Sequence, residues 1–191
     1  MHRFKPKRYE EYGYVLDVFP ASRKPGYQVA RNEFIVQILG EEYFTLLEAA
    51  VNERYKPQIG FRIYIGREAP RELIRIIKRI TSDELTEIAR INLENIVQKV
   101  VTEQESRFVE FFNRSNPISP RLHALELIPG VGKKMLQKVL EERDAKPFES
   151  YEDIKKRVGL LDPPSSIAKR ILDELFKKDE KYHIFVREFT Q

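Results

Sequence analysis

The sequence contains no cysteine, and only three of its 191 residues are histidine. Without cysteine, no disulfide, iron–sulfur cluster or thiolate zinc site can form, so packing and hydrogen bonds must stabilise the fold. The histidines, His2, His123 and His183, are scattered, and no two have the spacing of a metal site on a helix. We therefore expect no resident metal ion and no cofactor.

Long apolar runs are also absent. The longest ones, such as residues 34–39, are far too short to cross a bilayer, and residues 1–6 are not followed by a secretory apolar region. A composition with 41% hydrophobic and 34% charged residues is typical of a soluble globular protein with one sizeable core or two small ones. We expect a cytoplasmic protein without a membrane partner.

The excess of positive charge lies at the N-terminal end. The formal net charge is +4, and residues 1–31 contain seven basic residues against three acidic ones, a surplus equal to that net charge. The basic residues are Arg3, Lys5, Lys7, Arg8, Arg23, Lys24 and Arg31. Such a surplus of positive charge fits an anionic partner. A surplus of this size is, however, also common among proteins that bind no nucleic acid. Residues 1–11 are interpreted as a basic arm that either adds electrostatic affinity or is a solvated tail.

Residues 12–80 have the pattern of a β-rich domain. Strands are predicted over residues 12–19, 33–39, 43–49 and 61–65, the second and third forming a hairpin. Residues 73–80 fit both a helical face and a strand, and we favour a fifth strand. Five short strands predict a small Greek-key barrel of the oligonucleotide-binding (OB) kind, a frequent nucleic-acid platform, although other small barrels give the same pattern.

Helical patterns follow the predicted barrel. Residues 81–117 are interpreted as a helical linker that begins at a capping box and ends before two prolines. Residues 118–178 form a second domain, with short helices predicted over residues 121–128, 133–143, 151–158 and 166–176. Residues 179–191 contain a strand pattern at 182–187, which we expect to pair with an edge of the N-terminal sheet because a lone strand needs a partner. The predicted fold class is α+β.

The most informative segment is Ile128-Pro129-Gly130-Val131-Gly132-Lys133-Lys134, where one amphipathic helix ends and another begins. Glycine can adopt positive φ and lets a phosphate approach the backbone, while a helix N-terminus offers unpaired N–H groups and a partial positive charge. Lys133, Lys134 and Lys138 add mobile cations beside these groups. This combination favours a phosphate site over an ordinary turn between helices.

These residues resemble the helix-hairpin-helix family, whose pattern is a hydrophobic residue, Pro, Gly, a hydrophobic residue, Gly and a basic helix start. The resemblance implies sequence-independent contact with a nucleic-acid backbone through amides around Gly130, Gly132 and Lys133, sometimes with a monovalent cation held by hairpin carbonyls. Leu136 departs from the pattern, because it stands where the family usually has a small residue. A wider helix crossing is therefore expected.

A second copy of the hairpin is predicted at residues 158–171, since such units often occur in pairs. Ala168 supplies the small residue, but Asp162 and Pro164 stand where glycines are expected, and Pro164 has no N–H to donate. We interpret this copy as mainly structural, with Lys169 and Arg170 as outer contacts.

The order of segments along the whole chain is similar to an uncharacterised archaeal family of predicted nucleotide-binding or RNA-binding proteins. The hypothesis is a non-catalytic protein that binds nucleic acid, with RNA favoured over DNA and with the barrel as a second binding surface. The predicted contacts are Gly130, Val131, Gly132, Lys133, Lys134, Lys138, Lys169 and Arg170. On the barrel, the candidates for stacking on bases are Tyr12, Tyr14, Phe34, Phe61 and Tyr64, although each of them is more simply explained as a core residue.

Two alternatives stay open. The first is a DNA repair or nuclease-type enzyme, but the carboxylates have ordinary helix-surface spacing and form no cluster for magnesium, and Asp153 is better explained as the capping partner of Ser150. No catalytic residue is therefore predicted. The second is a module, residues 118–176, that docks on a protein or ribonucleoprotein partner.

Overall fold

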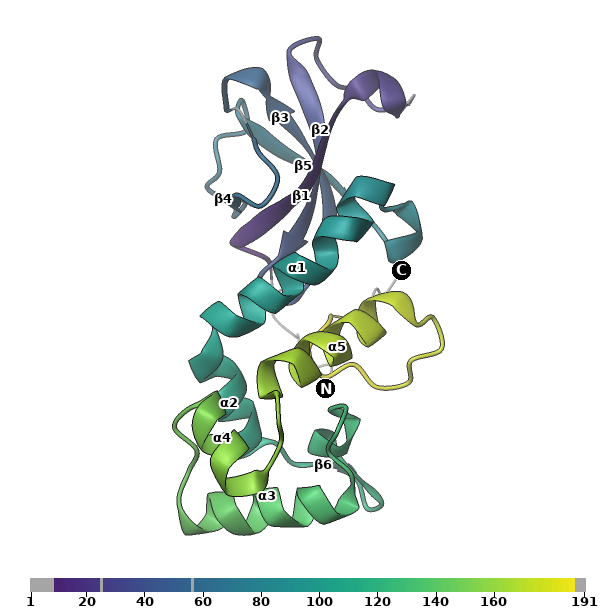
Figure 1. The fold of residues 1–191 in the computed structure, drawn as a ribbon. Coiled ribbons are helices and arrows are strands. Elements are labelled where there is room, and N and C mark those ends of the chain that lie inside the picture. The colour runs from purple at the N-terminus through teal and green to yellow at the C-terminus, as the bar shows by residue number, and fades with distance from the viewer. Residues whose placement is uncertain (1–8, 25, 56, 188–191) are drawn as a thin grey trace, which may run out of the picture. The chain divides into compact units, whose positions relative to one another are not determined.

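The computed structural model describes residues 9–24, 26–55 and 57–187, so most of the predicted basic arm lies outside the described residues. The described chain divides into two compact units, residues 9–96 with 186–187 and residues 97–185 (Figure 1). The predicted linker, residues 81–117, is thus shared between the two units. None of the described helices combines the length and the apolar character needed to span a membrane.

The N-terminal unit is built on a five-stranded antiparallel sheet with the order β4-β1-β2-β3-β5. The strands are β1 (Tyr12–Pro20), β2 (Glu33–Gly40), β3 (Leu46–Asn52), β4 (Arg62–Tyr64) and β5 (Ile74–Arg79). The first four follow the Greek-key order, in which the fourth strand lies beside the first. In the described residues β4 and β5 are not paired with each other, so the sheet is a half-barrel with an open seam. The α+β class and the fifth strand are confirmed.

The half-barrel forms because alternate residues of its strands are apolar and face the same interior. Val15, Val36, Ile38, Ala49 and Ile63 are all buried in one hydrophobic cluster. A bulge between Val15 and Asp17 in β1 increases the local bend that a curved sheet requires. The fold therefore rests on the same alternation that predicts the strands.

The third strand begins later than predicted, at Leu46 rather than at residue 43. Phe44 is fully buried with φ of 51°, a left-handed conformation that interrupts the strand. The carboxylate of Glu10 holds this turn, since it accepts hydrogen bonds from the amides of Glu42 at 2.9 Å and of Tyr43 and Thr45 at 3.0 Å. These amides are used by Glu10 and not by the neighbouring strand.

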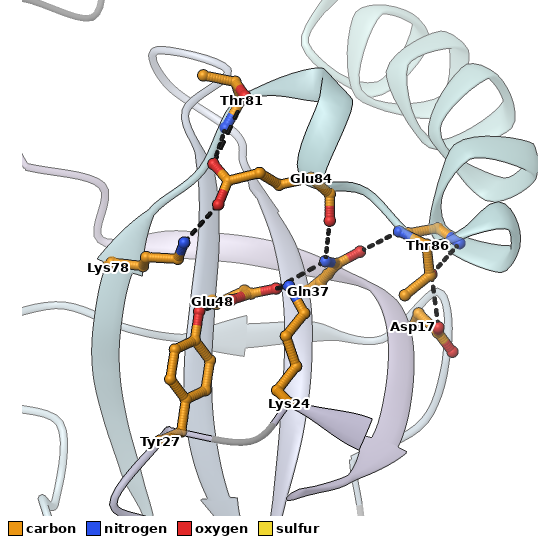
Figure 2. A network of polar contacts seen from close by, with 10 residues as sticks. Asp17, Lys24, Tyr27, Gln37, Glu48, Lys78, Thr81, Glu84 and Thr86 are labelled. Carbon is orange, nitrogen blue, oxygen red and sulfur yellow. Dashed lines mark hydrogen bonds and ion pairs between the residues drawn. The ribbon is translucent and has the colours of Figure 1, made fainter. Parts of the chain in front are cut away.

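A buried polar network connects the sheet to the start of α1 (Glu87–Glu103) in the N-terminal unit (Figure 2). The amide nitrogen of Gln37 donates to Glu48 at 2.8 Å and to the carbonyl of Glu84 at 2.9 Å. The backbone N–H of Thr86 donates to the side-chain oxygen of Gln37 at 2.9 Å, and its hydroxyl donates to Asp17 at 2.6 Å. The first turn of the helix is thereby fixed to β1 and β2.

The C-terminal unit consists of short helices and a two-stranded ribbon. Its elements after α1 are α2 (Glu105–Arg114), β6 (Pro117–Ser119), β7 (Leu122–His123), α3 (Lys133–Ala145), α4 (Tyr151–Val158) and α5 (Pro163–Phe176). The predicted helix over residues 166–176 starts earlier, at Pro163, because proline is well tolerated in the first turn of a helix.

The prediction of an α-helix over residues 121–128 is wrong. This segment contains β7 and a 3-10 turn, Ala124–Leu127. The side chain of His123 accepts from the amide of Leu125 at 3.1 Å, and Glu126 accepts from the amide of His123 at 2.8 Å. This capping box starts the turn at residue 124, and Pro129 lies too close for an α-helix to develop.

The predicted strand at residues 182–187 is also wrong over the described residues, which have no regular structure there. The carboxylate of Glu174 accepts from the amides of Ile184 at 2.9 Å and Phe185 at 3.0 Å, so these amides are not available to a sheet. The segment does return to the N-terminal unit, where the amide of Arg187 donates to the carbonyl of Tyr43 at 3.1 Å. Residues 188–191 lie outside the described residues.

Candidate nucleic-acid interface

The hairpin of residues 128–132 is a tight turn fixed by its sequence. The amide of Val131 donates to the carbonyl of Ile128 at 2.9 Å, with Pro129 and Gly130 between them. Proline followed by a residue of positive φ is the combination of a type II turn, and Gly130 has φ of 93°. Val131 is buried and its amide is used within the turn, so the prediction that it contacts nucleic acid is not supported by its position.

Gly130 is required for two reasons. Its positive φ is rarely adopted by other residues, and a Cβ atom placed on it would lie 3.2 Å from Cδ1 of Leu160 in the loop before α5. This close approach packs the first hairpin against the second. Gly130 therefore has a structural role beside the predicted contact.

Gly132, unlike Gly130, is not packed against another residue. It is exposed, its φ is −83°, and a Cβ atom placed on it would meet nothing within 4 Å. The first helical bond of α3 runs from the amide of Leu136 to the carbonyl of Gly132 at 2.8 Å, which leaves the preceding amides without helical acceptors. The N-terminus of α3 is thus open to an anion.

Lysines surround this open helix end. Lys133, Lys134 and Lys138 are all exposed, and none of them forms an ion pair with another described residue. Lys134 and Lys138 are four residues apart and share a face of α3. All three lysines lie in the first two turns of α3, directly after Gly132.

The second hairpin differs at the equivalent point. Asp162 caps α5, and its carboxylate accepts from the amide of Ser165 at 3.1 Å and from its hydroxyl at 2.8 Å. A negative charge therefore already occupies this helix end, where it opposes a phosphate. The geometry agrees with a structural role for this copy.

Of the two outer contacts predicted on α5, only Lys169 is exposed. Arg170 is buried, with a relative exposure of 5%, and its guanidinium pairs with Glu174 at 2.8 Å and Glu180 at 3.1 Å. Its assignment as a nucleic-acid contact is wrong, since a buried charge must be paired and Arg170 has its partners inside the protein. The glutamate four residues later, at position 174, is the signal in the sequence that identifies this pair.

The aromatic residues proposed on the barrel divide into two groups. Tyr14 is buried, and Tyr12 packs edge-on against Tyr64 with their ring centroids 5.2 Å apart. Phe34 and Phe61 are exposed, with relative exposures of 36% and 54%. Only these two are placed to stack on a base.

The described residues contain no group of three or more acidic or histidine side chains that could hold a metal ion. Half of the predicted capping box forms: the amide of Asp153 donates to the hydroxyl of Ser150 at 3.1 Å, but the carboxylate of Asp153 accepts from the amide of Glu149 at 3.1 Å. In the hairpin, the carbonyl of Leu125 accepts the amide of Ile128 at 3.1 Å, and the carbonyl of Ile128 accepts the amide of Val131 at 2.9 Å.

Sequence reasoning missed a row of arginines beside the half-barrel. Arg67, Arg71, Arg75 and Arg79 recur at every fourth position, and all line one cavity of the N-terminal unit with a volume of about 620 Å³. The regular spacing was visible in the sequence, but it crosses from a loop into β5, so no single element predicts that the four side chains meet.

The half-barrel and the hairpin-containing helical unit define an α+β protein of two units. The chain belongs to the family described as "Protein of unknown function (DUF655)", whose model matches residues 9–187. It is 41% identical over 184 residues to the "Uncharacterized protein MJ0038" of Methanocaldococcus jannaschii, which covers 96% of this chain and 82% of that protein. The crystal structure of Af1531 from Archaeoglobus fulgidus has the same fold, with a TM-score of 0.79 at 38% identity over 93% of this chain and all of that one. The predicted resemblance of this chain to uncharacterised archaeal proteins is confirmed. None of these descriptions names a ligand.

Proposed function

We propose that this protein is a non-catalytic nucleic-acid-binding protein, with RNA favoured over DNA, that holds one phosphate backbone at the Gly130–Lys134 hairpin. The observation that carries this proposal is the contrast between two helix ends in one unit. The N-terminus of α3 is uncapped and surrounded by three exposed lysines, while that of α5 is filled by Asp162.

The chemistry follows from groups that point at the open end of α3. The amides after Gly132 donate to phosphate oxygens, and the helix dipole favours the negative charge. Lys133, Lys134 and Lys138 supply cations that replace the counterions of the nucleic acid. Backbone contacts of this kind fix the position of the protein without reading the sequence of bases.

The test removes two of these cations. In the variant Lys133→Gln/Lys134→Gln we expect affinity for a single-stranded RNA to fall about tenfold at moderate salt, since each phosphate contact contributes to the salt dependence. The slope of log affinity against log salt concentration should become shallower by about 1.4, corresponding to two lost phosphate contacts on a single strand. Fluorescence anisotropy across a salt series measures both quantities.

The matched control is Lys155→Gln/Lys156→Gln, which removes the same charge from exposed lysines on α4. It should change the slope by much less than the test variant. Equal changes in both variants would mean that only the general charge of the unit attracts nucleic acid. The proposed phosphate site at the Gly130–Lys134 hairpin would then be rejected. The same series with DNA and with double-stranded RNA decides the preferred partner.

A further inference from the structure

A cavity of about 620 Å³ lies in the N-terminal unit at the open seam of the half-barrel. Its lining comes from β5, from the segment 65–71 that follows β4, and from Leu47 of β3. Of these, β5 and the segment after β4 adjoin the two edge strands of the sheet. The cavity therefore exists because β4 and β5 do not close the barrel.

The lining carries a large excess of positive charge. It includes five arginines and a single acidic residue, Glu10; the arginines are Arg67, Arg71, Arg75, Arg79 and Arg187. Glu10 is only 7% exposed, and both of its carboxylate oxygens accept backbone amides of the turn at residues 42–45. It offsets only a small part of the arginine charge.

The arginines differ in the contacts that their side chains make with other residues of the protein. Arg75 lies 3.6 Å from Glu33, and Arg79 donates to the hydroxyl of Thr45 at 3.0 Å. Arg67 lies over the ring of Tyr9, with its guanidinium carbon 4.3 Å from the ring centroid, and is exposed. Arg71 is exposed and has no ion pair or hydrogen bond with another described residue.

The surroundings of Arg79 disfavour its positive charge. Burial, followed by the nearby charge of Arg187, lowers the pKa of Arg79 from its ordinary value. Like charges that lie close together disfavour each other's charged state. A ligand that carries negative charge relieves this cost when it binds.

The floor of the cavity is apolar. Leu47, Ile65 and Ile74 belong to the hydrophobic cluster of the half-barrel, and Ala69 packs against the same cluster. A floor made of core residues is rigid, and it offers no partner to a fully hydrated ion. The cavity thus matches a ligand with an anionic group at one end and an apolar, flat part at the other.

We propose that this cavity binds a phosphorylated nucleoside, either as a free mononucleotide or as one nucleotide of a single strand. Its volume lies within the range of about 300–1,000 Å³ that small-molecule sites occupy. Guanidinium groups bind phosphate in a bidentate manner, and Arg67 and Arg71 are the two placed to do so at the rim. The base lies on the apolar floor. This site is separate from the hairpin of α3 and does not depend on it.

The experiment titrates the full-length protein with adenosine monophosphate, adenosine and inorganic phosphate by isothermal titration calorimetry. We expect the monophosphate to bind at least about tenfold more tightly than either part alone, because the site contacts both. The variant Arg67→Gln/Arg71→Gln should weaken binding of the monophosphate about tenfold. The matched control, Arg31→Gln/Arg54→Gln, removes the same charge from exposed positions of the same unit outside the cavity.

Each outcome decides the proposal. No saturable binding of the monophosphate, equal binding of monophosphate and inorganic phosphate, or equal weakening in the test and control variants would overturn it. Competition by a short oligonucleotide with a terminal phosphate, but not by its unphosphorylated form, identifies a strand end as the ligand. Competition by both forms identifies an internal nucleotide, and competition by neither identifies a free mononucleotide.

A second variant separates this site from the proposed function. Lys133→Gln/Lys134→Gln should bind the monophosphate as the wild type does, even where it has lost affinity for RNA. If the monophosphate instead loses its binding in that variant and keeps it in Arg67→Gln/Arg71→Gln, the nucleotide binds at the hairpin and the cavity assignment is wrong.

Discussion

Replacing Glu48 by glutamine is expected to lower the free energy of unfolding by about 2–3 kcal/mol at neutral pH, since hydrogen bonds to a charged group contribute about that much. Glu48 is fully buried and accepts from Lys24 at 2.7 Å, from Gln37 at 2.8 Å and from the hydroxyl of Tyr27 (Figure 2). Glutamine keeps the volume but removes the charge that binds Lys24. Denaturant unfolding measures the change.

The effect of this substitution should depend on pH in a defined direction. Burial alone would raise the pKa of Glu48, but the hydrogen bonds from Lys24, Tyr27 and Gln37 outweigh it and lower the pKa below its ordinary value of 4.5. An acid with a lowered pKa in the folded state stabilises the protein above its unfolded pKa, and this contribution is lost as the pH falls through the folded value. The difference between wild type and variant should therefore be full above about pH 4.5 and vanish in stronger acid.

The matched control for this prediction is Glu53→Gln. Glu53 is exposed in the short turn after β3, and surface substitutions of this kind usually change stability by less than about 0.5 kcal/mol. If Glu48→Gln is as mild as this control, the network does not hold the start of α1 on the sheet. A loss of stability that persists unchanged in acid would show that packing, not charge, is responsible.

The strands could be predicted because burial on one face leaves a period of two in the sequence. Val36, Ile38 and Ile63 show that period, and they form part of the core. The open seam could not be predicted, because alternation tells which residues face inward and not which strand edges pair. The late start of β3 could not be predicted for a related reason. It depends on the carboxylate of Glu10, which accepts from the amide of Thr45, 35 positions away in the sequence.

In the candidate site, too, the features set by neighbouring residues could be predicted, and those that depend on residues far away in the sequence could not. Pro129, Gly130 and Gly132 predicted the turn and the open helix end, because both are properties of a few neighbouring residues. The failure at Arg170 has a different origin, since its exposure depends on Glu180 and on the chain near residue 182, which lie beyond the helix. The arginine cavity likewise depends on how β3 and β5 are arranged in space.

Two neighbouring glycines provide the second prediction, because they differ in conformation and surroundings. Gly130→Ala should lower the free energy of unfolding by about 2 kcal/mol, since a left-handed residue with a side chain costs about 1–2 kcal/mol and the new methyl group crowds Leu160. Gly132→Ala should change stability by less than about 0.5 kcal/mol, because its φ of −83° suits alanine and the lower entropy of the unfolded chain offsets the poorer cap. Thermal unfolding of both variants measures this contrast.

Affinity for nucleic acid should depend on Gly132 even though stability does not. The methyl group of Gly132→Ala has no neighbour within 4 Å in the free protein, but in the proposed binding mode it would crowd a phosphate that contacts the amides of α3. We expect this variant to bind single-stranded RNA about tenfold more weakly while it unfolds as the wild type does. If it binds RNA as tightly as the wild type, the phosphate does not lie at the N-terminus of α3. Because Gly132→Ala leaves the fold and every charge unchanged, a loss of binding in it can be assigned to the backbone contact itself.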